Sequence, residues 1–237
     1  TLANLVLTDS TRALFISNLD GNPASPFQIT PSVLASAAGS RVGIQIEGGS
    51  SYLDLRNLTL SNWGWGVHST NNSNLRFEDL DLSTNGPRNV NENRGLEVSG
   101  SNIYVADVIA NGRRIGLYAH DLTNFTVDTF SSNQAGTAFR LDNMTLAPTN
   151  TLSLTNIRGT NSDIALQVFN LDGQLASPFV IDATLLSDTT GSGTGIDLNS
   201  NSSNLVVRGA SAAARWALPN AVYGILMTGA SNTNIRL

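Results

Sequence analysis

Apolar residues alternate with polar or variable residues in many short stretches along this chain. One stretch recurs nine times and begins with a small residue, as in Gly43-Ile44-Gln45-Ile46 and Gly95-Leu96-Glu97-Val98, and successive copies start 21 to 30 residues apart. Alternation with a period of two predicts short strands that bury one face. Stretches of helical length with a period of 3.6 residues are missing. The chain is therefore expected to be all-β.

Each repeat holds two further alternating stretches. One is usually preceded by Asn or Ser, as in Asn74-Leu75-Arg76-Phe77, and the other follows a polar corner, as in Asn57-Leu58-Thr59-Leu60. Asn, Asp, Ser and Gly suit such corners because they tolerate left-handed backbone and form Asx turns. Three strands per unit predict coils of a parallel β-helix, which bury their apolar sides by stacking. An antiparallel sandwich is the rival, but the Asn-Gly hairpin signal occurs only at Asn85-Gly86 and Asn111-Gly112.

The recurring Gly-Ile-x-Ile, Ser-Asn-Leu-x-Phe and Asn-Leu-x-Leu phrases resemble those of the right-handed parallel β-helix (pectate-lyase-like) superfamily along the whole chain. The residue between the second and third strands, at Asn57, Asp79 and Asn156, is similar to that family's corner Asn. The resemblance implies a right-handed parallel β-helix solenoid of about nine coils with three short strands each. It selects no activity, because the superfamily includes lyases, hydrolases, epimerases, phage tailspikes, adhesins and structural proteins.

The chain also contains a longer repeat that spans several coils. The phrase that runs from Asn18 to Phe27 returns from Asn170 to Phe179, an offset of 152 residues, and residues 1–56 match residues 153–208 at 24 of 56 positions. A shared Asn-Leu-Asp-Gly loop favours a duplication over convergence on common coil rules. We interpret residues 1–237 as a single β-helix domain, with a first super-repeat of about six coils at 1–152 and a partial second one at 153–237.

Both termini are expected to fall inside a second strand, and neither carries an amphipathic helix or a polar capping segment. Bare terminal coils expose core side chains and unpaired strand edges. We therefore expect uncapped ends, and we predict that the natural chain continues beyond them or that like subunits stack end to end.

Composition narrows the classes of function. The chain has 18 acidic residues against 13 basic ones, all of them arginine, so its net charge of −5 argues against nucleic-acid binding. The absence of cysteine excludes a disulfide scaffold, a zinc finger and a thiol enzyme. Apolar runs fall well short of the roughly 20 residues that a membrane span needs. Together with the resemblance, these features favour an extracellular or cell-surface protein.

The variable position of each first strand is expected to face outward, because its two neighbours face the core. Stacking places these positions in one column, with neighbours about 5 Å apart. The column reads Phe15, Gln45, His68, Glu97, Tyr118, Arg140, Gln167, Asp197 and Leu226. The resemblance implies that a polysaccharide would lie along this face, and it makes the central residues the candidate catalytic group: His68, Glu97, Tyr118 and Arg140.

Chemistry at a uronate sugar needs a base, an acid and a cation for the carboxylate. His68 or Tyr118 suits the base or the acid, Glu97 an acid or a metal ligand, and Arg140 a carboxylate clamp. We predict that ligand-binding residues surround them: Trp63, Asn91, Glu92, Arg94, Gln45 and Gln167.

Two further aromatic residues near the column receive structural assignments. Trp65 has the same parity as Val67, so it is expected to pack in the core or at a corner. His120 follows Tyr118 by two positions and is interpreted as a corner residue.

Other features speak against catalysis. Every β-helix has an outward column of mixed polar residues, and this chain lacks the lysine base used by several lyase families of the fold. Neither the Asp-Pro-His phrase of alginate epimerases nor the clustered Asp pair of polygalacturonases occurs. Asp20 and Asp172 in the repeated loop are the calcium candidates, but a turn role is favoured for both. We predict no metal site and no cofactor.

Two functions remain in view. The favoured one is a structural or adhesive segment of a secreted or surface β-helix, a rod, fibre or stalk that also contacts glycans. It agrees with the lack of a known catalytic motif and with an outward column that differs between the two super-repeats, where Phe15 aligns with Gln167. The alternative is a polysaccharide lyase, epimerase or hydrolase that acts on an acidic polysaccharide along the first-strand face. The predicted partners are therefore a polysaccharide or like subunits, and the sequence leans against an enzyme.

Overall fold

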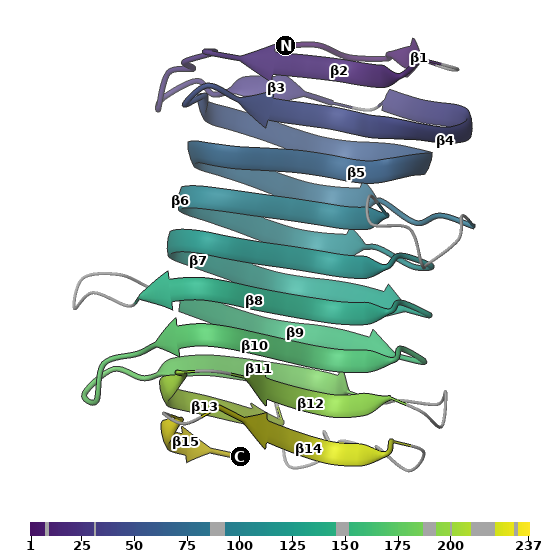
Figure 1. The fold of residues 1–237 in the computed structure, drawn as a ribbon. Helices are drawn as coiled ribbons and strands as arrows, with labels where there is room; N and C mark the ends of the chain where they lie inside the picture. Colours follow the sequence, from purple (N-terminus) through teal and green to yellow (C-terminus); the bar gives the residue numbers. More distant parts are fainter. Residues whose placement is uncertain are drawn as a thin grey trace.

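The computed structural model describes residues 1–7, 10–30, 32–85, 93–145, 152–186, 193–199, 201–209, 221–229 and 232–237. The regular structure in these ranges is entirely β-strand. The strands are β1 (Val6–Leu7), β2 (Arg12–Ser17), β3 (Phe27–Ile29), β4 (Ser32–Glu47), β5 (Ser51–Asp81), β6 (Arg94–Ile109), β7 (Ile115–Asn133), β8 (Thr137–Thr145), β9 (Leu152–Thr160), β10 (Ile164–Asp172), β11 (Phe179–Leu186), β12 (Thr194–Asn199), β13 (Ser203–Gly209), β14 (Tyr223–Thr228) and β15 (Thr233–Arg236). Figure 1 shows them stacked in successive turns, from β1 and β2 at one end to β14 and β15 at the other.

All pairings between these strands are parallel, which confirms the expected parallel β-solenoid. Strands β5, β6 and β7 are long because each continues past a corner onto another side of the solenoid, as the wrapped ribbons of Figure 1 show. Parallel neighbours within one sheet need a crossover, and here the crossover is the rest of the turn. Each turn therefore buries its apolar side against the turns above and below.

The predicted outward column is confirmed position by position. Register pairs join Phe15 to Gln45, Gln45 to His68, and His68 to Glu97. The remaining pairs continue through Tyr118, Arg140, Gln167, Asp197 and Leu226. The expected nine coils thus correspond to nine first-strand segments in register within the described residues.

Small residues recur at the start of the first strand because neighbouring turns approach closely there. A Cβ atom built on Gly95 would lie 2.5 Å from the carbonyl oxygen of Gly116 and 2.6 Å from Cβ of Ala110. A carbonyl oxygen comes equally close at Gly66, where the oxygen of Gly95 would lie 2.6 Å from an added Cβ. The repeat of small residues in the sequence is therefore a packing requirement of the stacked backbone.

The core is a set of apolar columns that run the length of the solenoid. In the first strands, Ile44, Val67, Leu96 and Leu117 follow one another in register, and all four are fully buried. Burying a side chain of this size stabilises the fold by about 1.5–3 kcal/mol. Because each turn supplies only one layer, stability depends on the stacking of turns rather than on any single one.

Corners explain the richness in asparagine. Among the described residues, 21 non-glycine positions have positive φ, and all except Tyr52, Thr129 and Gln134 are Asn or Asp. The predicted corner residues Asn57 and Asn156 have φ values of 53° and 54°. A short polar side chain lowers the cost of left-handed backbone because it can hydrogen-bond locally. The abundance of Asn therefore reflects the many left-handed corner positions.

The duplicated loops adopt the same structure. Asn22 forms an isolated antiparallel β-bridge with Ser25, and Gln174 forms one with Ser177 at the equivalent position. The carboxylate of Asp20 accepts a hydrogen bond from the hydroxyl of Ser51, and that of Asp172 accepts one from Ser203. The shared phrase thus encodes a shared loop closed against the next turn.

Candidate functional site

The first-strand face is packed rather than freely solvated. Its central carboxylate, Glu97, is only 6% exposed, and Asp197 near the far end is 7% exposed. His68, Tyr118 and Arg140 are each half-buried. An outward position on a solenoid is usually solvated, so side chains here must cover one another. The face therefore differs from the surface expected of a plain rod.

Alternating aromatic rings and guanidinium groups cover the centre of this face. The guanidinium carbon of Arg94 lies 4.8 Å from the centre of the Tyr118 ring and 5.6 Å from that of Trp65. The guanidinium carbon of Arg140 lies 5.1 Å from the centre of the Tyr118 ring and 4.7 Å from that of Phe169. We call these five residues, Trp65, Arg94, Tyr118, Arg140 and Phe169, the cation–aromatic ladder. Stacking orients a guanidinium and leaves its N–H edge available for planar anions.

Glu97 is the centre of an ionic cluster beside the ladder. Its Oε2 lies 2.6 Å from Nη1 of Arg94, and its Oε1 lies 3.4 Å from Nε2 of His120. Burial disfavours the carboxylate, but His120 and Arg94 together hold the pKa of Glu97 below its usual range. The ionised form of Glu97 is thus favoured, whereas a general acid must hold its proton at the working pH.

The pKa values of the two histidines shift in opposite directions. Burial lowers the pKa of His68 below its ordinary value of 6.5. Burial acts the same way on His120, but its hydrogen bonds to Glu97 and Asp121 outweigh it and raise the pKa of His120. Compared with an ordinary histidine, His68 therefore favours its neutral form and His120 its protonated form.

Several polar atoms of the face are buried without a hydrogen-bond partner in the described part of the chain. They are Nε1 of Trp65, Nδ1 of His68, Nε of Arg94, Oε2 of Glu97, Nε2 of His120, Nε of Arg140 and Oδ1 of Asp197. Buried polar groups are nearly always hydrogen-bonded, and exceptions gather at functional sites. Apart from Nε2 of His120, these unsatisfied atoms belong to the ladder or to the column predicted from the sequence.

One predicted ligand contact is wrong. Trp63 is 1% exposed, and its indole N–H donates to the carbonyl oxygen of Leu34 at 2.9 Å. The ring fills space that Gly43 leaves open, since a Cβ there would lie 3.2 Å from Cγ of Trp63. Trp63 is therefore a core residue without a face on which a sugar ring could stack.

The other predicted ligand-binding residues differ in where the structure places them. Arg94 belongs to the ladder, whereas Asn91 and Glu92 lie outside the described residues. Gln45 and Gln167 lie on the same face and bond to carboxylates beside them. Nε2 of Gln45 donates to Oε2 of Glu47 at 3.0 Å, and Nε2 of Gln167 donates to Oδ2 of Asp197 at 2.9 Å.

Sequence reasoning missed Trp65, His120 and Phe169 as members of the face. Trp65 contacts the ring of His68, with ring centres 4.3 Å apart, although it has the parity of the buried Val67. The backbone turns at the corner before the first strand, so residues three apart share the outward side, as the ion pair of Arg94 with Glu97 shows. His120 and Phe169 each follow a column residue by two positions, and this period was the available signal.

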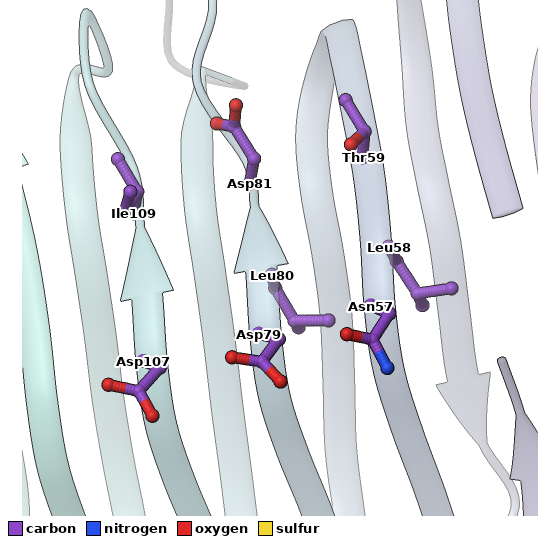
Figure 2. A pocket seen from close by; sticks show the side chains of 8 residues that line it. All are labelled: Asn57, Leu58, Thr59, Asp79, Leu80, Asp81, Asp107 and Ile109. Atoms are coloured by element: carbon purple, nitrogen blue, oxygen red, sulfur yellow. The ribbon is translucent and has the colours of Figure 1, made fainter. Parts of the chain in front are cut away.

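A corner groove is the second candidate region. It is a cavity of about 390 Å³ lined by Asn57, Leu58, Thr59, Asp79, Leu80, Asp81, Asp107 and Ile109. Figure 2 shows Asn57 and Asp79 of β5 and Asp107 of β6 at equivalent positions on successive turns. Within the described residues, no group of three or more His, Cys, Asp or Glu side chains is arranged to hold a metal ion. The groove is therefore an acidic surface without a candidate metal site among the described residues.

The calcium candidates take part in ordinary contacts. Asp20 and Asp172 accept hydrogen bonds from serines of the next turn. The local Asx-type bond in the first loop comes instead from Asn22, whose Oδ1 accepts from the backbone N–H of Ala24 at 2.9 Å. These contacts of Asp20 and Asp172 thus join neighbouring turns, and the local turn bond of the first loop belongs to Asn22.

Comparisons with known proteins identify no relative of this chain. No protein-family model matches the chain, and comparisons with curated proteins and with solved structures find no match either. The described ranges also contain no helix with the length and apolar character of a membrane span. The functional argument therefore rests on the face itself.

Proposed function

We propose that this chain is a segment of an extracellular or cell-surface β-solenoid of the pectate-lyase-like superfamily that binds an acidic polysaccharide lengthwise along its first-strand face. The sequence phrases described above support the superfamily assignment. The observation that carries the binding proposal is the cation–aromatic ladder, in which two arginines are sandwiched between three aromatic rings.

The ladder suits a chain of uronate sugars in two ways. Its guanidinium groups are oriented by stacking and already bind carboxylates, Arg94 through Nη1 to Glu97 and Arg140 through Nη2 to Asp142. The remaining N–H donors of each guanidinium would bind the carboxylate of a uronate. Its groups repeat at the spacing of the solenoid turns, about 4.8 Å, which is close to the length of one sugar in an extended polysaccharide. A linear polymer can therefore meet one ladder residue at each turn, with a guanidinium at every second turn.

Titration calorimetry with a galacturonate oligosaccharide tests this proposal, with a neutral glucan of the same length as the control ligand. Replacing Arg140 with Gln should weaken binding about tenfold or more, because a charge-assisted pair is lost. The matched control is Arg76→Gln. Arg76 stacks over Tyr104 with 4.4 Å between guanidinium carbon and ring centre, but on the second-strand face. Equal loss in both variants, or equal binding of the glucan, would contradict the proposal.

An enzyme is the second candidate, and the opposite directions in which the pKa values of His68 and His120 shift favour it. Pairs of titratable groups with pKa values pushed apart are typical of acid–base sites. His68 would take the proton from the ring carbon next to the carboxylate. The bond from the adjacent ring carbon to the glycosidic oxygen would break, its electrons leaving with that oxygen, while the electrons of the broken C–H bond form a carbon–carbon double bond. His120 would then protonate the leaving oxygen.

Incubation with polygalacturonate separates the two candidates. Unsaturated uronate ends absorb ultraviolet light, so their formation can be followed by absorbance. A signal that is present with the natural sequence and lost in both His68→Ala and His120→Ala supports the enzyme. Binding without any such product supports the non-catalytic solenoid.

A further inference from the structure

His120 is held between two carboxylates and a ring. Its Nδ1 lies 2.9 Å from Oδ2 of Asp121, and its Nε2 lies 3.4 Å from Oε1 of Glu97. The ring also stacks on Tyr118, with 4.6 Å between ring centres and 29° between planes. Nδ1 lies within hydrogen-bond distance of Asp121, whereas Nε2 faces Glu97 at ion-pair distance without a hydrogen bond of ordinary geometry. Because both ring nitrogens face carboxylate oxygens, this environment favours the protonated ring over the neutral one.

Charged groups approach His120 from every strand packed around it. Asp142 of β8 lies opposite His120 in register, and β7 itself contributes Asp121. Among the described residues, the titratable and charged groups around His120 include His68 from β5, Arg94 and Glu97 from β6, Tyr118 and Asp121 from β7, and Arg140 and Asp142 from β8. The arginines bond to Glu97 and Asp142, which leaves His120 as the group whose charge changes near neutral pH.

Loss of the proton removes one of the two N–H donors. The imidazole then donates to either Glu97 or Asp121 and presents a lone pair to the other oxygen, which is repulsive. Tyr118, the middle ring of the cation–aromatic ladder, stacks on this imidazole and loses a fixed neighbour. The face also loses one positive charge next to its buried carboxylate.

We propose that protonation of His120 controls ligand binding on the first-strand face, with the protonated ring locking Tyr118 and Glu97 and deprotonation lowering affinity for an acidic polysaccharide. This regulation rests on the proposed function of the face as a polysaccharide-binding surface.

Affinity for a galacturonate oligosaccharide should be measured from about pH 5 to about pH 9, across the histidine range. We expect affinity to fall at least about fivefold as pH rises through the His120 pKa. The His120→Gln variant should show the weaker affinity at every pH. Asp121→Asn removes one carboxylate and should move the midpoint to lower pH. The exposed Asp107→Asn, in the corner groove, is the matched control and should leave the midpoint unchanged.

Proton NMR without ligand separates failure of this inference from failure of the proposed function. The His120 ring should titrate above 6.5, and the ring signals of Tyr118 should follow the same midpoint. If no ligand binds at any pH but this coupling is seen, the proposed function is wrong and the proton-controlled contact stands. Binding that does not vary with pH, or a pH dependence that survives in His120→Gln, overturns the inference.

Discussion

Nη1 of Arg113 donates to the carbonyl oxygen of Trp63 across 2.5 Å, although fifty residues separate them in the sequence. The same guanidinium donates from Nε to the carbonyl oxygen of Leu82 at 2.6 Å, and Nη1 also lies 3.2 Å from Oδ1 of Asn93. Arg113 is fully buried. Burial lowers its pKa to about 9, and none of the described ion pairs involves it. It ties together three successive turns just before Trp65 and Arg94 enter the ladder.

Replacing Arg113 with Met should destabilise the protein by about 3 kcal/mol, because the carbonyl groups of Trp63 and Leu82 then lack their buried donor. Urea unfolding followed by circular dichroism measures this change. Arg158 is exposed, and Arg158→Met should change stability by no more than about 0.5 kcal/mol. A similar small effect in both variants would show that water replaces the guanidinium.

The two histidines should give stability a maximum near pH 6.5. The folded pKa of His120 is raised, so its contribution is complete below 6.5 and is lost as pH rises through the folded value. The folded pKa of His68 is lowered, so its folded form resists protonation and stability falls as pH drops below 6.5. Urea midpoints measured across this range should therefore decline on both sides.

Single variants separate the two sides of this profile. His120→Gln should flatten the alkaline side, and His68→Gln should flatten the acidic side down to the range where carboxylates titrate. A profile that keeps both slopes in both variants would assign the pH dependence to other groups.

Thr129 is a misfit at its corner. It has φ of 69° although it is β-branched, whereas the next residue in its corner column, Asn156, has φ of 54°. Left-handed backbone costs an ordinary L-residue about 1–2 kcal/mol, and Asn recovers part of that cost. Thr129→Asn should therefore stabilise the protein by about 1 kcal/mol in thermal unfolding. Thr145→Asn, at an exposed position that is not left-handed, should give no gain.

Gly95 should not accept a methyl group. The carbonyl oxygen of Gly116 would lie 2.5 Å from the new Cβ, so Gly95→Ala should cost about 1–3 kcal/mol through overpacking. Gly224 occupies the same column in β14, and a Cβ atom added there would have no neighbour within 4 Å. Gly224→Ala should be nearly neutral, and equal effects at the two sites would contradict the packing argument.

Much of the fold was predictable because a solenoid repeats one short rule. Period-2 alternation after a small residue placed His68, Glu97 and Tyr118 in one column, and the observed register agrees at each step. Corner positions such as Asn57 were predictable from residue type, since left-handed backbone has few tolerant residues. Local pattern and stacking point to the same answer, so little remained to be decided by long-range packing.

The sequence by itself determined the all-β solenoid, its turn boundaries and the residues of the outward column, because those follow from periods that neighbouring residues obey. Only the tertiary structure decided that Trp63 is buried while Trp65 lies beside His68, since the two residues have the same parity along the strand. It also decided that His120 meets Glu97 and that Arg113 reaches three turns. Such contacts depend on the direction of long side chains at corners and on the spacing between turns. The alternation of residues along one strand contains no information about either.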